Sequence, residues 1–325
     1  MTAEPLGAVE PASIEAAEGD AGPGVERSPR AAALDLSIAA GLWGGLYVVS
    51  AATFEVVPPI TLNVLRLVVG VAVLAVAFRG DLGIGRASAR RVVAAGVIVA
   101  VTMALQFVGT SLTGAAEGAL LTTTTPAFVL LLGVVLERQR VGRIAWLGVS
   151  IALVGVAAIA ARDRGFGGLG GPTILGVPAS LAGDLLLVGA AATWALFSHA
   201  GKPLVAQVGA FRAILQASSV GILLLLPFVP VELSRTPIGA VTPVTVLAVL
   251  YLGVMATSVA WSLWYRGYAA TPATVSAAAF FAQPVVGAVL GVTLLGEDLD
   301  ALFLVGGGAI VVGVLAIVAG GRAEG

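Results

Sequence analysis

Cysteine is absent from this chain, and histidine occurs once, at His199. The missing thiols exclude disulfides, thiolate metal sites and a cysteine nucleophile. A single histidine is too few for a histidine-based metal site, and no GxxxxGK[ST] loop is present to hold nucleotide phosphates. We therefore expect no metal, no cofactor and no direct use of ATP.

Charge is also scarce. Charged residues make up 11% of the 325 residues, and 58% are hydrophobic, whereas soluble domains carry about 25% charged residues. A soluble protein of this length would lack the charge to cover its surface. The net charge of −1 gives no electrostatic reason to expect a nucleic-acid partner. We expect the chain to be surrounded by lipid.

Long apolar runs recur from residue 34 to residue 320. A helix that crosses about 30 Å of hydrocarbon needs about 20 apolar residues, and most uncharged runs have that length. One more span is interrupted only by Arg66. The sequence predicts an all-α integral membrane protein with ten transmembrane helices, at 34–53, 59–78, 92–110, 114–136, 143–161, 183–200, 208–229, 243–265, 271–295 and 301–320.

Composition divides the chain into five parts. Residues 1–33 are rich in Ala, Glu, Pro and Gly and lack aromatics, which predicts a disordered cytoplasmic N-terminal tail. Residues 34–161 form a first five-helix repeat, and residues 183–320 form a second. The glycine-rich segment 162–182 is expected to link them. Residues 321–325 form a short C-terminal tail.

The positions of Lys and Arg predict the orientation. With both termini in the cytoplasm, only Arg162, Arg164 and Arg235 of the 17 Lys and Arg residues fall in outer segments, and Arg66 lies within a span. All the others face inward, as the positive-inside rule requires. The composition fits the plasma membrane of a bacterium.

The two halves resemble each other in sequence. Several residues recur at an offset of 158, namely Pro126 and Pro284, Gly133 and Gly291, Gly148 and Gly306, and Gly155 and Gly313. Trp43 and Trp194 correspond at an offset of 151, each in the first helix of its half. Because each half has an odd number of helices, the second enters the membrane from the opposite side. This predicts an inverted-topology repeat; chance similarity between glycine- and valine-rich helices is the alternative.

Four stretches resemble the EamA-type family of the drug/metabolite transporter superfamily. They are Trp43–Ser50 (WGGLYVVS), the Pro59…Arg66 pattern, Thr123–Arg138 and Gln283–Glu297. The resemblance covers roughly residues 34–320. It implies ten helices, a central cavity between the halves, and export or exchange of small metabolites, amino acids or drug-like compounds.

One spacing departs from the repeat. Pro126 and Glu137 are 11 residues apart, whereas Pro284 and Glu297 are 13 apart. The shorter spacing predicts a shortened cytoplasmic end of the fourth helix.

Two ionisable residues inside the spans are candidates for function, because charges at membrane depth usually face a cavity or the bundle interior. Arg66 offers a planar fork of donors for an anion; alternatively it snorkels or binds carbonyl groups of a neighbouring helix. Glu117 is a candidate for proton coupling or for binding a cationic substrate. It also fits a helix N-terminus, where a carboxylate stabilises the dipole.

Aromatic residues occur at helical i,i+4 spacing, which places each pair on one helix face. The pairs are Trp43 with Tyr47, Trp194 with Ser198, and Trp261 with Tyr265. We list them as cavity-lining candidates that would stack on a planar or cationic solute. Helix packing and an interfacial aromatic belt are the alternatives.

Three amides, Gln106, Gln216 and Gln283, complete the candidate substrate site, because an amide in hydrocarbon needs a partner. Asp35 and Asp184 are each followed by Leu near the start of a half, which predicts helix N-caps.

These features favour a secondary active transporter of small molecules that works by alternating access, rather than an enzyme. A membrane enzyme or a channel is the alternative, although no catalytic cluster is recognisable. Arg66 and Glu117 suit a zwitterion, whereas the tryptophans suit an aromatic or cationic compound, so the substrate stays open. The oligomeric state stays open too, with a homodimer as one alternative.

Overall fold

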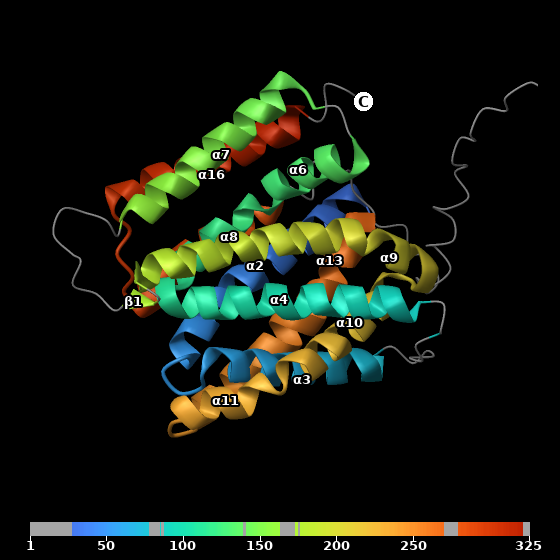
Figure 1. Cartoon of the computed structure of the whole chain (residues 1–325), viewed down its shortest axis with the longest axis vertical. Coiled ribbons are helices and arrows are strands. Elements are labelled where there is room, and N and C mark those ends of the chain that lie inside the picture. The colour runs from blue at the N-terminus through green and yellow to red at the C-terminus, as the bar shows by residue number, and fades with distance from the viewer. Residues whose placement is uncertain are drawn as a thin grey trace, which may run out of the picture.

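The computed structural model describes residues 28–77, 85, 88–138, 141–162, 173–174, 176–269 and 279–320 (Figure 1). The described part of the first half consists of α2 (Pro29–Thr53), α3 (Pro59–Ala77), α4 (Ala89–Thr113), α5 (Ala115–Leu121), the 3-10 turn η2 (Thr122–Thr124), α6 (Thr125–Glu137) and α7 (Arg143–Arg162). A short antiparallel hairpin follows, and its two strands, β1 (Thr173–Ile174) and β2 (Val177–Pro178), have two residues each.

The second half is also helical. Its described elements are α8 (Ala179–Ala200), α9 (Lys202–Val208), α10 (Ala210–Leu225), α11 (Phe228–Arg235), α12 (Pro243–Leu250), the π-helix η3 (Tyr251–Val259), α13 (Ala260–Ala269), α15 (Ala282–Leu290), the π-helix η4 (Gly291–Leu295) and α16 (Ala301–Gly320). Of the predicted N-terminal tail at 1–33, residues 1–27 lie outside the described residues, and residues 29–33 belong to α2. The tail at 321–325, the linker residues 163–172 and the start of the ninth span at 271–278 also lie outside the described residues.

The described residues contain eight helices that are long and apolar enough to cross a membrane. A ninth is obtained when α10 and α11, which meet at a bend of 48°, are taken as one span. The segment Ala282–Leu295 is a shorter apolar helix. The chain is therefore a helical multi-pass membrane protein, as its composition predicted.

Two predicted helix starts are wrong. Asp35 and Asp184 are not N-caps but buried residues inside α2 and α8, which begin at Pro29 and Ala179. The N-cap of α2 is Ser28, whose hydroxyl accepts a hydrogen bond from the Ala31 N–H at 3.3 Å. Proline at the first helical position fixes this start, because it needs no hydrogen-bond partner there.

The fourth predicted span contains a 3-10 turn. Each of Thr122, Thr123, Thr124 and Thr125 donates its hydroxyl proton to a carbonyl three or four residues earlier. Such bonds bend helices, and Pro126 also lacks the N–H that a regular helix needs. The span therefore passes from α5 through the 3-10 turn η2 to α6.

The predicted shortening of this span is also wrong. Helix α6 ends at Glu137 and η4 ends at Leu295, which are equivalent positions at the repeat offset of 158. Each is followed by a left-handed residue, Arg138 and Gly296. Glu297 lies beyond the end of its helix, so it is not the counterpart of Glu137.

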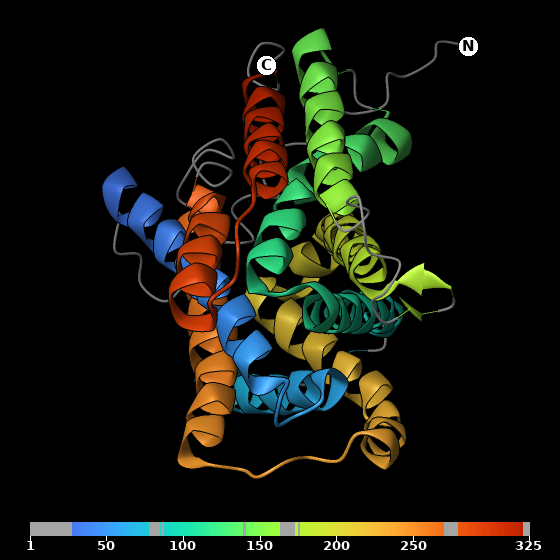
Figure 2. The ribbon, with the colours of Figure 1, turned by 90° about the vertical axis from the view of Figure 1, so that its left-hand side faces the viewer.

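Helices α7 and α16, the last of each half, pack against each other through glycine (Figures 1 and 2). A Cβ atom on Gly313 would lie 2.5 Å from the Gly148 carbonyl oxygen, and one on Gly155 would lie 2.5 Å from that of Gly306. The later residue of α7 thus contacts the earlier residue of α16, so the two helices are antiparallel. Small residues allow this close approach in lipid, where no hydrophobic force drives helices together.

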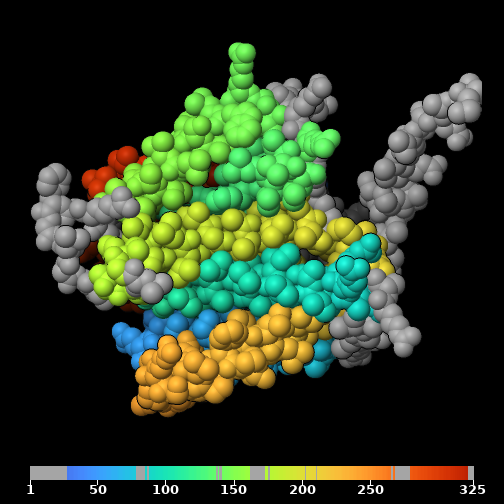
Figure 3. Space-filling model, viewed as in Figure 1, coloured from blue at the N-terminus to red at the C-terminus, as the bar shows by residue number. Residues whose placement is uncertain are grey.

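The two halves are interleaved rather than placed side by side. Figure 3 shows α4 of the first half (teal) between α8 (yellow) and α10 (gold) of the second, and both of these pack on α4. The space between the halves is therefore lined by helices from both.

The glycine contact predicts a sharp difference between two positions on α16. Gly313→Ala should destabilise the protein by about 1–3 kcal/mol, because the added methyl group meets backbone atoms of α7. Gly308→Ala is the matched control, since a Cβ there has nothing within 4 Å. Thermal unfolding in detergent measures both, and equal midpoints for the two variants would contradict the packing described here.

Candidate functional site

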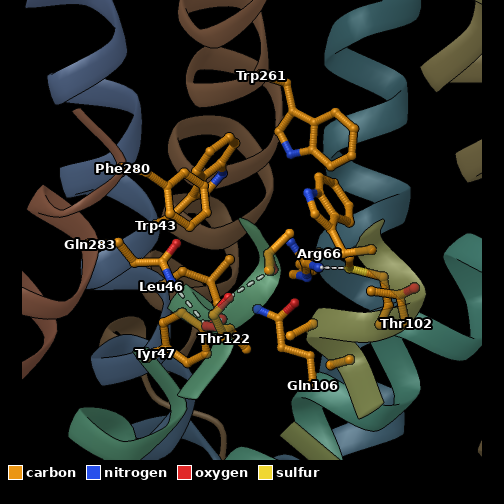
Figure 4. Close-up of a pocket in the computed structure, with 15 residues that line it drawn as sticks. Trp43, Leu46, Tyr47, Arg66, Thr102, Gln106, Thr122, Trp261, Phe280 and Gln283 are labelled. Carbon is orange, nitrogen blue, oxygen red and sulfur yellow. Dashed lines mark hydrogen bonds between the residues drawn. The ribbon is translucent and has the colours of Figure 1, made fainter. Parts of the chain in front are cut away.

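A cavity lies between the two halves (Figure 4). It holds about 540 Å³ of atom-free space, including the part that opens to solvent. Its lining comes from α2, α3, α4, η2, α6, α8, α13 and α15, together with Phe280 just before α15. The described lining residues are Trp43, Leu46, Tyr47, Arg66, Thr102, Met103, Gln106, Thr122, Thr125, Ala190, Ala191, Trp194, Trp261, Phe280 and Gln283.

Seven of the residues singled out in the sequence line this cavity, namely Trp43, Tyr47, Arg66, Gln106, Trp194, Trp261 and Gln283. Glu117, Ser198 and Gln216 do not line it. Ser198 is exposed and donates its hydroxyl proton to the Trp194 carbonyl on its own helix. Gln216 and Glu117 are buried elsewhere in the bundle. The side chain of Tyr265 lies outside the described residues.

Arg66 is buried, with 2% of its surface exposed, and its guanidinium points into the cavity (Figure 4). Nε donates to Asn63 Oδ1 at 3.3 Å, and one terminal nitrogen donates to Thr257 Oγ1 at 3.1 Å. The other terminal nitrogen contacts Met103 Sδ at 2.7 Å, and the group lies 4.6 Å from the centre of the Phe107 ring. All of these partners are electrically neutral.

Aromatic side chains form the part of the cavity wall opposite Tyr47 and Gln106 (Figure 4). Trp194 and Trp261 meet edge to face with ring centres 5.3 Å apart. Trp43 and Phe280 are 5.9 Å apart. The indole N–H of Trp43 donates to the Ala256 carbonyl at 3.0 Å, which fixes the ring in place.

A hydrogen-bonded group at Thr122 joins three helices. The Tyr47 hydroxyl lies 2.7 Å from Thr122 Oγ1, and Gln283 Nε2 donates to the same oxygen at 3.0 Å and to the Ala119 carbonyl at 3.0 Å. Buried hydrogen bonds between helices compensate for the loss of water. Two of the predicted candidates, Tyr47 and Gln283, therefore have structural partners as well as a place in the cavity wall.

Sequence reasoning did not single out several lining residues. Thr102 lies one helical turn before Gln106, and its hydroxyl is buried without a hydrogen-bond partner among the described residues. That i,i+4 relation to a chosen amide was a usable signal. Met103, Leu46 and Phe280 gave none, because they are apolar residues within apolar runs.

Outside the cavity, two carboxylates of the second half cap helices of the first. Glu232 accepts hydrogen bonds from the Ile60 N–H at 2.9 Å and the Thr61 N–H at 2.7 Å, at the start of α3. Glu297 accepts hydrogen bonds from the N–H groups of Ala115 and Ala116, at the start of α5. A carboxylate satisfies the free donors and the positive dipole end of each helix.

The described residues contain no group of three or more His, Cys, Asp or Glu side chains that could hold a metal ion. The chemical resources of the cavity are thus one guanidinium, hydroxyl and amide groups, and aromatic rings.

The group at Thr122 gives a stability prediction. Gln283→Leu should destabilise the protein by about 1–3 kcal/mol, because it leaves the Ala119 carbonyl and the Thr122 hydroxyl without this donor. Thr293→Val is the control, since that exposed hydroxyl bonds only to the Val289 carbonyl on the same segment. Thermal unfolding in detergent should show a lower midpoint for Gln283→Leu alone. An unchanged midpoint would contradict a stabilising role for the hydrogen-bonded group at Thr122.

Known proteins share this architecture. A solved crystal structure superposes with a TM-score of 0.62 at 22% identity, covering 92% of this chain and 100% of that one. The "Uncharacterized transporter YetK" of Bacillus subtilis is 29% identical over 210 residues, which are 65% of this chain and 62% of that protein, so the chain spans less than two thirds of it.

Two further relatives match over more of their length. The "Uncharacterized transporter YwfM" of Bacillus subtilis is 25% identical over 88% of this chain and 93% of that protein. The "Probable terminal-alkyne amino-acid exporter" of Streptantibioticus cattleyicolor is 29% identical over 79% of this chain and 82% of that protein. The model of the EamA-like transporter family matches twice, at residues 31–161 and 181–319. The chain therefore belongs to the EamA-like transporter family, within the drug/metabolite transporter superfamily.

Proposed function

We propose that this protein is a secondary active transporter, an exporter or exchanger of small metabolites, amino acids or drug-like compounds that works by alternating access. The observation that carries the proposal is the cavity, which both halves line and which holds polar and aromatic groups within the helical bundle. Transporters with two repeats place their substrate site at the interface between the repeats.

The contacts of α7 and α16 support an inverted repeat. Repeat equivalence pairs Gly148 with Gly306 and Gly155 with Gly313. The observed contacts join Gly148 to Gly313 and Gly155 to Gly306. Replacing each glycine of one contact by its equivalent in the other half gives the other contact. Such exchange is expected for two units related by a two-fold axis.

Other helix pairs support the same relation. Helix α4 packs on α8. The helices equivalent to these in the opposite halves are α13 and α2, and they are also in contact. Likewise α3 packs on η3 while α10 packs on α4, and α2 packs on α15 while α8 packs on α6. On this basis we assign the bent pair α10–α11 to the seventh span and Ala282–Leu295 to the ninth, and we propose ten spans in all.

The alternatives are a membrane enzyme and a channel. The described cavity wall contains no acid, no histidine and no pair of groups arranged as nucleophile and base, so nothing there favours catalysis. A channel is distinguished by its flux, because it shows neither saturation nor acceleration by substrate on the opposite side. Amino acids fall within the proposed range of substrates, and the name of the Streptantibioticus relative attributes amino-acid export to that protein.

Transport is tested with purified protein in liposomes. Labelled amino acids, organic anions and organic cations are offered with and without a pH gradient, and we expect saturable flux of one class that substrate on the opposite side accelerates. Trp43→Ala should lower the flux at least about ten-fold through loss of aromatic contact. Trp146→Ala, whose ring is 43% exposed outside the cavity, is the matched control. Flux that never saturates would instead indicate a channel.

Proton coupling through Glu117 has its own variant. If Glu117 carries the proton, Glu117→Gln removes the response of the flux to the pH gradient and leaves exchange between equal concentrations intact. A response that persists in Glu117→Gln would mean that Glu117 does not carry the proton and only stabilises the N-terminus of α5.

Orientation is open to labelling because the chain has no cysteine of its own. We propose that both termini lie in the cytoplasm of a bacterial cell. Ser111→Cys, at an exposed position near the end of α4, should then react with a membrane-impermeant thiol reagent on intact cells. Gly85→Cys, also exposed, should react only after permeabilisation. The reverse pattern would invert the proposed topology.

A further inference from the structure

Resting on the proposed function, we infer that the transported solute is an organic anion with an apolar, preferably aromatic, body. Its carboxylate would bind beside Arg66 and Gln106, and its body would lie against the tryptophans. The inference follows from the charge balance of the cavity and from the separation of its polar and aromatic parts.

Arg66 is a buried cation whose described surroundings supply no negative charge. Asn63, Thr257, Met103 and Phe107 are its contacts, and none of them is ionised. Ionisable side chains within membranes usually pair with an opposite charge, because an uncompensated charge is costly there. Arg66 is also the only described lining residue that carries a full charge at neutral pH. The described residues thus supply no countercharge to Arg66, and we infer that the solute supplies it.

Arg66 and the polar side chains beside it have hydrogen-bond donors that are available to an anion. A guanidinium has five N–H donors, and the described contacts of Arg66 use one on each nitrogen. The amide of Gln106 makes no hydrogen bond to any described residue, and neither does the buried hydroxyl of Thr102. Both line the cavity, and Figure 4 shows the Gln106 amide directed toward its centre. Polar groups left without protein partners in a membrane interior indicate where water or solute binds.

The remaining wall fits an apolar body rather than a second charge. Trp43, Trp194, Trp261 and Phe280 line it, and the described lining contains no carboxylate for an ammonium group. The faces of the aromatic rings would attract a cation, but the described lining offers it no opposite charge. A zwitterion would gain from Arg66 at one end and lack an acidic partner at the other. The cavity therefore favours a monoanion over a zwitterion, and a zwitterion over a cation.

Four probes with one phenyl body separate these classes. Hydrocinnamate is the anion, phenylalanine the zwitterion, phenethylamine the cation, and hydrocinnamamide the neutral isostere of the anion. Binding to the full-length protein in detergent is measured by titration calorimetry, without any need for flux. We expect hydrocinnamate to bind more tightly than its amide and phenethylamine to bind most weakly. Equal binding of hydrocinnamate and hydrocinnamamide, tighter binding of phenethylamine, or no binding of any probe would overturn the inference.

Variants assign the effect to Arg66. Arg66→Gln should weaken hydrocinnamate binding by about 30-fold or more, the usual consequence of removing one member of a buried charge pair. It should leave hydrocinnamamide binding nearly unchanged. Arg66→Lys keeps the charge and should retain part of the preference. Arg91→Gln is the matched control, because that exposed arginine contacts Gln207 outside the cavity.

Gln106→Glu provides an independent test in case Arg66→Gln does not fold. This change places a carboxylate in the cavity wall, so the charge of Arg66 becomes compensated and the cavity loses its net positive charge. Hydrocinnamate binding should then fall and phenethylamine binding should rise; an unchanged order of the probes would contradict the proposal. Binding of the anion without flux in liposomes would refute transport and leave the substrate class intact. Saturable flux of cations alone would support transport and refute the proposed substrate class.

Discussion

Hydrocarbon offers no water to a polar group, and much of this structure follows from that constraint. Backbone groups are satisfied within helices, and the hydroxyl groups of Thr122–Thr125 return to carbonyls of their own segment. At the starts of α3 and α5, a carboxylate accepts hydrogen bonds from the free N–H groups of the helix. Of the polar groups without a hydrogen-bond partner among the described residues, those of Gln106 and Thr102 line the cavity between the halves, whereas Ser50 Oγ and Asn63 Nδ2 do not.

The same constraint accounts for how the halves are held together. Because lipid is as apolar as leucine, the helices associate through close contact and interhelical hydrogen bonds. Glycine provides the contact between α7 and α16, and the Thr122 group provides hydrogen bonds between α2, η2 and α15. The Thr122 group also forms part of the cavity wall, where large rings and long polar side chains line the space between the helices.

Sequence patterns predicted the helical segments and much of the cavity lining, because a tryptophan, arginine or glutamine within an apolar run is costly unless something accommodates it. They did not predict which face of a helix such a residue occupies. Ser198 shares i,i+4 spacing with Trp194, yet it is exposed and bonds to its own helix. The local conformation of the backbone was equally hidden. Asp35 and Asp184 have the chemistry of N-caps, but α2 and α8 begin earlier, and the length of an apolar run says nothing about a 3-10 turn or a π-helix within it.

The caps formed by Glu232 and Glu297 have a consequence for how the two halves evolve. In each cap the second half contributes a side chain, whereas the first half contributes mainly peptide N–H groups. Any residue other than proline supplies such a donor, so these hydrogen bonds do not themselves depend on the side chains at positions 60, 115 and 116. The constraint falls on a single residue of one repeat. Duplicated halves can in this way diverge far in sequence and still keep the same junction.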